Sequence, residues 1–177
     1  MNAVTRWFGP KFHELHPLLQ ALHESGGHLH GQVRITARGW LGHRLGRMLK
    51  VPTDVPARNM EVEIRHTGDT LHWLRRFDNG QESLSIFQPH GQWPDGYWTE
   101  TRGGTLLRMT VDVVDGGWRW RPLGVRVQGL PLPLWLFPSS RAGKRIEGER
   151  YVFEVAFALP VAGDVLSYSG TLELRVP

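Results

Sequence analysis

The clearest signal along the chain is a set of apolar residues that alternate with polar ones, the pattern of half-buried β-strands. The first such segment puts Leu29, Val33, Ile35 and Ala37 on one face. Similar segments recur, and together they predict about eight strands, which begin near residues 28, 60, 71, 84, 107, 118, 151 and 166. Short turns join most of them, which favours a mainly β fold, an antiparallel meander that closes as a barrel or half-barrel. An all-β sandwich is the alternative.

Two segments follow helical spacing instead. Residues 1–25 predict a helical cover, one or two helices broken around Gly9-Pro10 and His16-Pro17. The range Trp40–Lys50 predicts one short, basic amphipathic helix. Such a helix can lie on a membrane surface or cap a barrel mouth, although most pack on their own sheet. We expect a single domain over residues 1–177, with the barrel formed by residues 28–177.

The meander around Arg75 allows a register to be predicted. If Gly68-Asp69 and Asn79-Gly80 are two-residue turns, each inward residue has a defined partner. The predicted pairs are Met60 with Phe77, Val62 with Arg75 and Ile64 with Trp73, then Trp73 with Ile86 and Arg75 with Leu84. This register places Arg75 on the apolar face, between Trp73 and Phe77.

A buried guanidinium cannot lose its charge and needs compensation. One possibility is a bulge that turns Arg75 to solvent and leaves Leu74 in the core. A second is an internal carboxylate, for which Glu100 is the candidate. A third is a cavity in which Arg75 binds the acid group of an amphipathic ligand. We predict that Arg75 is buried or lines a pocket.

The remaining hairpins carry most of the aromatic residues. Trp118 and Trp120 return from a turn at Gly116-Gly117, and a change of parity after them predicts a bulge near Pro122. In the last hairpin, a two-residue turn at Gly163-Asp164 would place Phe157 opposite Gly170, with Tyr168 on the same face. The range Ser139–Glu149 is predicted as a polar loop.

The range Gly129–Pro138 is apolar and interrupted by three prolines, so it predicts a loop rather than a strand or a membrane span. We expect it to bury Leu132, Leu134 and Trp135 against the sheet or against a partner.

Composition narrows the function classes. The 177 residues include 21 Lys and Arg against 17 Asp and Glu, a net charge of +4 that is too small for a nucleic-acid footprint. There is no cysteine, which excludes disulfides and thiolate chemistry. His28 and His30 have a chelating spacing but no third ligand nearby, so we predict no metal and no other cofactor. No apolar run approaches spanning length, and the expected location is the cytoplasm.

Several short motifs carry a resemblance to a known family. They are FGPKFHELHPLLQALH at the N-terminus, LGRMLKVP, WLRRF at Trp73–Phe77, TETRGG around Glu100, GLPLPLWLFP and the closing YSGTLEL. On these motifs the chain resembles an uncharacterised bacterial family, the domain of unknown function 4166. The family has no assigned reaction, so the resemblance implies a discrete module and no catalytic residue.

Three function classes follow. The first is a binder of a lipid-like or other apolar, possibly anionic, small molecule inside the barrel. Its candidate ligand-binding residues are Arg75, Trp73, Phe77, Glu100, Trp118, Trp120 and Tyr168. The second is a non-catalytic module that docks on a protein or membrane surface through Trp40–Lys50 and Gly129–Pro138. The third is an enzyme with a pocket acid.

Overall fold

The computed structural model describes residues 2–160 and 162–175, and most of them form strands. The helical elements are α1 (Ala3–Phe8), η1 (Gly9–Glu14), α2 (Pro17–Ser25), α3 (Gly39–Leu49) and the short 3₁₀ turn η2 (Leu134–Leu136). The strands are β1 (Gly27–Ala37), β2 (Ala57–Thr67), β3 (Thr70–Phe77), β4 (Glu82–His90), β5 (Tyr97–Arg102), β6 (Thr105–Val114), β7 (Gly117–Val127), β8 (Leu130–Leu132), β9 (Ser139–Glu147), β10 (Arg150–Leu159) and β11 (Gly163–Arg175).

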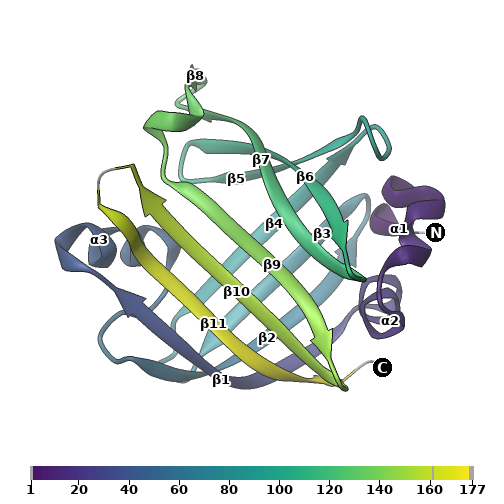
Figure 1. The fold of residues 1–177 in the computed structure, drawn as a ribbon, viewed down its shortest axis with the longest axis horizontal. Coiled ribbons are helices and arrows are strands. Elements are labelled where there is room, and N and C mark those ends of the chain that lie inside the picture. The colour runs from purple at the N-terminus through teal and green to yellow at the C-terminus, as the bar shows by residue number, and fades with distance from the viewer. Residues whose placement is uncertain (1, 161, 176–177) are drawn as a thin grey trace.

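The strands close into an antiparallel barrel (Figure 1). The order runs from β6 through β5, β4, β3, β2, β1, β11, β10 and β9 to β7, and β7 pairs with β6 to complete a ring of ten strands. The eleventh strand, β8, pairs only with the end of β7. The predicted mainly β barrel is confirmed, and the closed ring replaces both the half-barrel and the sandwich.

Ten strands form the ring rather than about eight because two of them lack a clear alternation. The first is β5, which lies in the aromatic, turn-rich stretch before Gly104. The second is β9, where a polar loop was predicted and is wrong. Its inward positions carry Ser140, Ala142 and Lys144, which are too small or too polar to mark a buried face.

The register of the meander is confirmed for its first hairpin and wrong for its second. Val62 lies opposite Arg75 and Ile64 opposite Trp73, as predicted. Across the next turn, however, Arg75 faces Ser83 and Trp73 faces Ser85. The turn has three residues, 78–80, rather than two, and it is closed by a hydrogen bond from the Phe77 amide to the Gln81 carbonyl at 3.0 Å. The shift of one residue turns Leu84 and Ile86 outward, where they are 43% and 42% exposed.

In the hairpin of β6 and β7, the predicted residues share one face. Trp118 lies opposite Val113 and Trp120 opposite Val111, and the predicted bulge near Pro122 is present. The turn itself falls one residue earlier than expected, at Asp115 and Gly116, which both have positive φ.

The last hairpin was predicted in the wrong register. Gly170 lies opposite Phe153, and Phe157 lies opposite Leu166. The main reason is that Leu159 already pairs with Gly163, so β11 begins at the residue predicted to open the turn, and the bulge between Phe157 and Ala158 shifts the register by one residue. The loop includes residue 161, which lies outside the described residues.

Helices cover the two ends of the barrel. The N-terminal helices lie at one end, with α3 toward the other (Figure 1). The breaks near Gly9 and Pro17 are those predicted. These helices fill their end with six side chains that are at most 5% exposed, namely Trp7, Phe8, Phe12, Leu15, Leu19 and Leu22. The N-terminal helices thus form the floor of the barrel.

Candidate functional site

The barrel encloses a cavity of about 540 Å³. Its lining extends from Trp73, Trp118 and Lys144 near the floor to Leu41 and Leu45 of α3. The cavity therefore lies between the N-terminal helices and α3. Most of its wall is apolar, supplied by inward side chains of strands from both halves of the ring.

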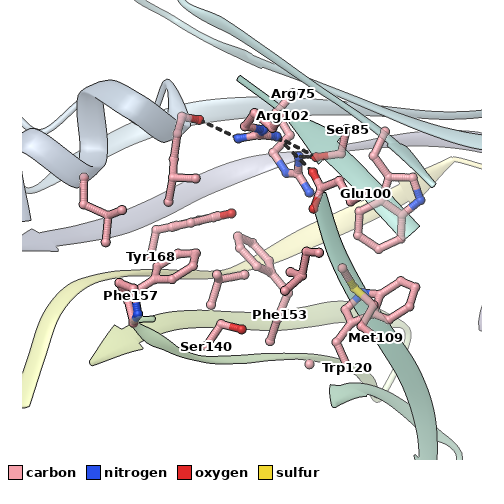
Figure 2. Close-up of a pocket in the computed structure, with 18 of the residues that line it drawn as sticks. Arg75, Ser85, Glu100, Arg102, Met109, Trp120, Ser140, Phe153, Phe157 and Tyr168 are labelled. Atoms are coloured by element: carbon pink, nitrogen blue, oxygen red, sulfur yellow. Dashed lines mark hydrogen bonds and ion pairs between the residues drawn. The ribbon is translucent and has the colours of Figure 1, made fainter. Parts of the chain in front are cut away.

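The apolar part of the wall includes the face of the last hairpin. Phe153, Phe157 and Tyr168 line the cavity, with Met109 and Trp120 from the β6–β7 hairpin beside them (Figure 2). This face can take a hydrocarbon or aromatic group through burial alone, at about 25 cal/mol per Å² of apolar surface removed from water.

The opposite wall carries a polar cluster formed by Arg75, Ser85, Glu100 and Arg102 (Figure 2). The Ser85 hydroxyl accepts a hydrogen bond from Arg75 Nη1 at 3.0 Å and another from Arg102 Nη2 at 2.8 Å. Arg102 Nη2 also donates to Glu100 at 3.2 Å. The cluster thus contains two guanidinium groups and one carboxylate, which leaves it with a net positive charge.

The sequence therefore placed Arg75 on the correct face of β3 but gave it the wrong protein partner. Glu100 forms its ion pair with Arg102, and Arg75 bonds to Ser85. The Arg75 guanidinium carbon also lies 5.6 Å from the centre of the Trp73 ring, within the range of a cation–π contact. Arg102 was not predicted as a site residue, because β5 had not been recognised as a strand.

The other predicted ligand-binding residues divide into two groups. Trp73, Trp118, Trp120 and Tyr168 all line the cavity together with Arg75 and Glu100. Phe77 is buried, at 4% exposure, but belongs to the packed core rather than to the cavity lining.

The floor of the cavity holds a pair of buried basic side chains that the sequence did not reveal. Lys144 Nζ lies 2.6 Å from Nε2 of His23 on α2. Lys144 is 5% exposed and His23 is fully buried. The amine also lies 4.0 Å from the Trp73 ring centre and 3.8 Å from that of Trp118.

Burial is the main cause of the lowered pKa values of Lys144 and His23. It lowers the pKa of Lys144 well below the usual lysine value, and the charge of Arg75 lowers it further. Burial, followed by the charges of Lys144 and His66, lowers the pKa of His23. Each indole ring favours a desolvated ammonium by about 2 kcal/mol. Taking an ion out of water costs several kcal/mol, and Lys144 forms no ion pair within the described residues, so the neutral amine is favoured.

The helix α3 is fastened over the cavity at its C-terminal end. The carbonyl of Leu49 accepts hydrogen bonds from Arg102 Nη1 and from the Ser83 hydroxyl, each at 3.1 Å. A cation at a helix C-terminus is favourable because the last carbonyls carry partial negative charge. Arg102 therefore links α3 to the polar cluster.

The range Gly129–Pro138 does not pack on the sheet as expected. Leu132 and Leu134 are 36% and 41% exposed, and Trp135 is 70% exposed. The expected burial against the sheet is thus wrong, and contact with a partner stays a prediction. The range forms β8 and η2, and Phe137 and Pro138 just beyond η2 line the cavity.

The histidine pair on β1 shows no metal geometry. His28 is exposed, and His30 Nε2 lies 3.2 Å from the Glu173 carboxylate. Over residues 2–160 and 162–175, no group of three His, Asp or Glu side chains is arranged to hold a metal ion.

Fold and cavity together define a closed antiparallel β-barrel with an internal site. Comparison with protein families matches residues 15–172 to the Domain of unknown function (DUF4166), and the chain belongs to this family. A search among curated proteins found no match. In the described part of the chain, no helix has both the length and the apolar character needed to cross a membrane.

Proposed function

We propose that the protein binds an amphipathic, anionic small molecule with an apolar tail inside the barrel. The observation that carries the proposal is the asymmetry of the cavity, which has a positively charged cluster on one wall and an aromatic face on the other. A volume of about 540 Å³ lies within the range of roughly 300–1,000 Å³ typical of small-molecule sites.

The charge of the polar cluster favours a ligand with an acid group over a ligand with a neutral one. Arg75 and Arg102 already converge on the single hydroxyl of Ser85. A carboxylate or phosphate beside that hydroxyl would accept charge-assisted hydrogen bonds from both guanidinium groups. Its tail would then lie along Phe153, Phe157 and Tyr168.

The test compares dodecanoic acid with dodecanol in calorimetric titrations of the wild type and of Arg75→Ala. A hydrogen bond to a charged group contributes about 1.5–3 kcal/mol. We therefore expect Arg75→Ala to weaken binding of the acid by roughly 10- to 100-fold and to change binding of the alcohol much less.

Arg76→Ala is the matched control, because the neighbouring Arg76 bonds to Glu63 and Glu82 on the outer face. It should leave both affinities unchanged. Equal losses for acid and alcohol in Arg75→Ala would reduce Arg75 to a structural residue, and absence of binding by the wild type would overturn the proposal.

A second function is favoured by exposed apolar side chains around the cavity mouth. This rim surface consists of Trp40 and Met48 on α3 together with Leu134, Trp135 and Leu136 on η2, each between 41% and 71% exposed. Three exposed cations lie on α3 or at its C-cap, namely Arg44, which also lines the cavity, Arg47 and Lys50. Apolar side chains among cations fit an anionic membrane surface, to which each such cation contributes about 1 kcal/mol. We infer that the rim docks there.

The docking test is sedimentation with vesicles of phosphatidylcholine, with or without phosphatidylserine. The wild type should bind only the anionic vesicles, and the double variant Trp40→Ala, Trp135→Ala should lose most of that binding. Val114→Ala is the control, since Val114 is 43% exposed and ends β6, beside the turn that contacts His16 near the floor. Failure to bind vesicles, or self-association through the rim instead, would overturn membrane docking.

A further inference from the structure

Lys144 is the feature of the cavity that ligand binding by Arg75 leaves unexplained. Its amine reaches the cavity lining, contacts His23 Nε2 at 2.6 Å and lies between the Trp73 and Trp118 rings. Within the described residues no carboxylate pairs with it. The amine is thus held in a fixed place without the usual partner of a buried lysine.

The surroundings of Lys144 are not optimised for folding. Three nitrogens next to it, Trp73 Nε1, Trp118 Nε1 and His23 Nδ1, are buried without a hydrogen-bond partner in the described part of the chain. Buried polar groups normally find partners, and clusters that do not are often functional. An apolar side chain at position 144, opposite Phe153 on β10, would fill the same space without the cost of burying an amine.

A buried amine without a counter-ion is a nucleophile, because the neutral form keeps its lone pair. Burial and the nearby charge of Arg75 both favour that form. The amine is also at the inner end of a largely apolar cavity, where an apolar molecule would arrive and bulk water would be displaced.

We propose that Lys144 forms a reversible imine with the carbonyl carbon of an apolar aldehyde or ketone that enters the barrel. This inference rests on the proposed function, since the carbonyl compound must occupy the same cavity. It adds a covalent step and narrows the ligand class to molecules that carry a carbonyl group.

The step balances without an oxidant or reductant. The Lys144 nitrogen forms a bond to the carbonyl carbon, and the carbonyl π electrons move to oxygen. Both amine protons leave with that oxygen as water when the carbon–nitrogen double bond forms. His23 Nε2 is within hydrogen-bond distance of Nζ and can carry a proton from the nitrogen toward the departing hydroxyl. Arg75 opposes protonation of the product, which favours a neutral imine.

The test is incubation with dodecanal, reduction of the imine at successive times with borohydride, which also reduces a neutral imine, and peptide mass mapping. The chain contains only three lysines, Lys11, Lys50 and Lys144, so the first two act as internal controls. Lys50 is exposed, and Lys11 lies beside Glu14. On accessibility alone Lys50 would react fastest. We expect Lys144 to be modified at least about tenfold faster, with competition by excess dodecanoic acid.

Two variants refine the result. Lys144→Met should lose the adduct while it still binds dodecanoic acid, which shows that the cavity persists. His23→Gln should slow trapping severalfold without weakening acid binding, an effect that a purely structural role would not produce. If dodecanoic acid binds but Lys144 is not modified ahead of Lys50, the imine is wrong and the proposed function stands. If neither compound enters, both are wrong.

Discussion

At the scale of single residues, Lys144 stands out because it costs stability where it lies. The unfolded chain carries the lysine as an ammonium, and the folded barrel favours the neutral amine. Releasing that proton at neutral pH lowers the free energy of unfolding. The contacts to Trp73 and Trp118 return only part of this cost.

We therefore predict that Lys144→Met raises the free energy of unfolding by about 1–4 kcal/mol at pH 7, the range found when buried charges give way to apolar residues. Methionine matches the length of lysine and packs well against aromatic rings. The gain should shrink as the pH approaches the ordinary lysine value of 10.5, because the unfolded chain then also loses its proton.

Urea denaturation at pH 7 and pH 10 measures both effects. Lys50→Met, a substitution at the exposed C-cap of α3, is the control and should change stability little. A loss of stability in Lys144→Met would contradict the prediction and would mean that the ammonium is stabilised in the floor.

The contrast between Arg75 and Lys144 explains which site residues the sequence could reveal. Arg75 lies between Trp73 and Phe77 on a strand with strong alternation, so its face could be predicted. Lys144 lies on a strand whose inward neighbours include Ser140 and Ala142, which give no apolar pattern. On β9 the cavity is lined by small and polar side chains, so no apolar alternation marks that part of its wall.

At the scale of elements, the length of the turn decided whether the register of the Arg75 meander could be predicted. The turn after Thr67 has two residues, and the register of β2 and β3 was correct. The turn after Phe77 has three residues, and every pair that follows it was displaced by one. An Asn-Gly pair favours a tight turn but does not fix its length, because the flanking hydrogen bonds compete.

The helix α3 shows a second limit at this scale. The sequence predicted the position of α3 but not the role of its two interior glycines, Gly42 and Gly46. A Cβ at Gly42 would lie 2.2 Å from the Val165 carbonyl oxygen, and one at Gly46 would lie 2.5 Å from Thr53 Cγ2. Gly42 is therefore where α3 approaches β11 of the barrel closely, a contact far apart in sequence, and Gly46 is where the helix packs against the loop that follows it.

At the scale of the whole molecule, closure of the ring depends on pairings that no local pattern reveals. β9 pairs with β7 through three residue pairs and with β10 along its full length, although β8 and η2 intervene in sequence between β7 and β9. The first of those three pairs joins Trp118 to Lys144. The pairing of β7 with β9 is the seam of the barrel, and the basic pair Lys144 and His23 therefore lies at this seam.

The floor also makes the molecule sensitive to acid. His23 on α2 touches Lys144 on β9, and its backbone carbonyl lies 2.9 Å from Nε2 of His66 on β2. The groups that face His23 are therefore basic or aromatic. Its pKa is lowered below the ordinary histidine value of 6.5, first by burial and then by Lys144 and His66.

Below pH 6.5 the unfolded chain binds a proton at His23, whereas the folded chain does not until the pH falls to its lowered pKa. The free energy of unfolding is therefore highest above pH 6.5 and falls as the pH drops below that value. We predict that the free energy of unfolding falls by about 1 kcal/mol per such histidine between pH 6.5 and pH 5.5. His66 is half-buried, and solvent screening makes its share smaller. Urea midpoints across this range measure the slope.

His23→Gln should flatten this pH dependence, whereas His13→Gln, at an exposed position of η1, should not. An unchanged slope in His23→Gln would show that acid acts elsewhere than at the seam.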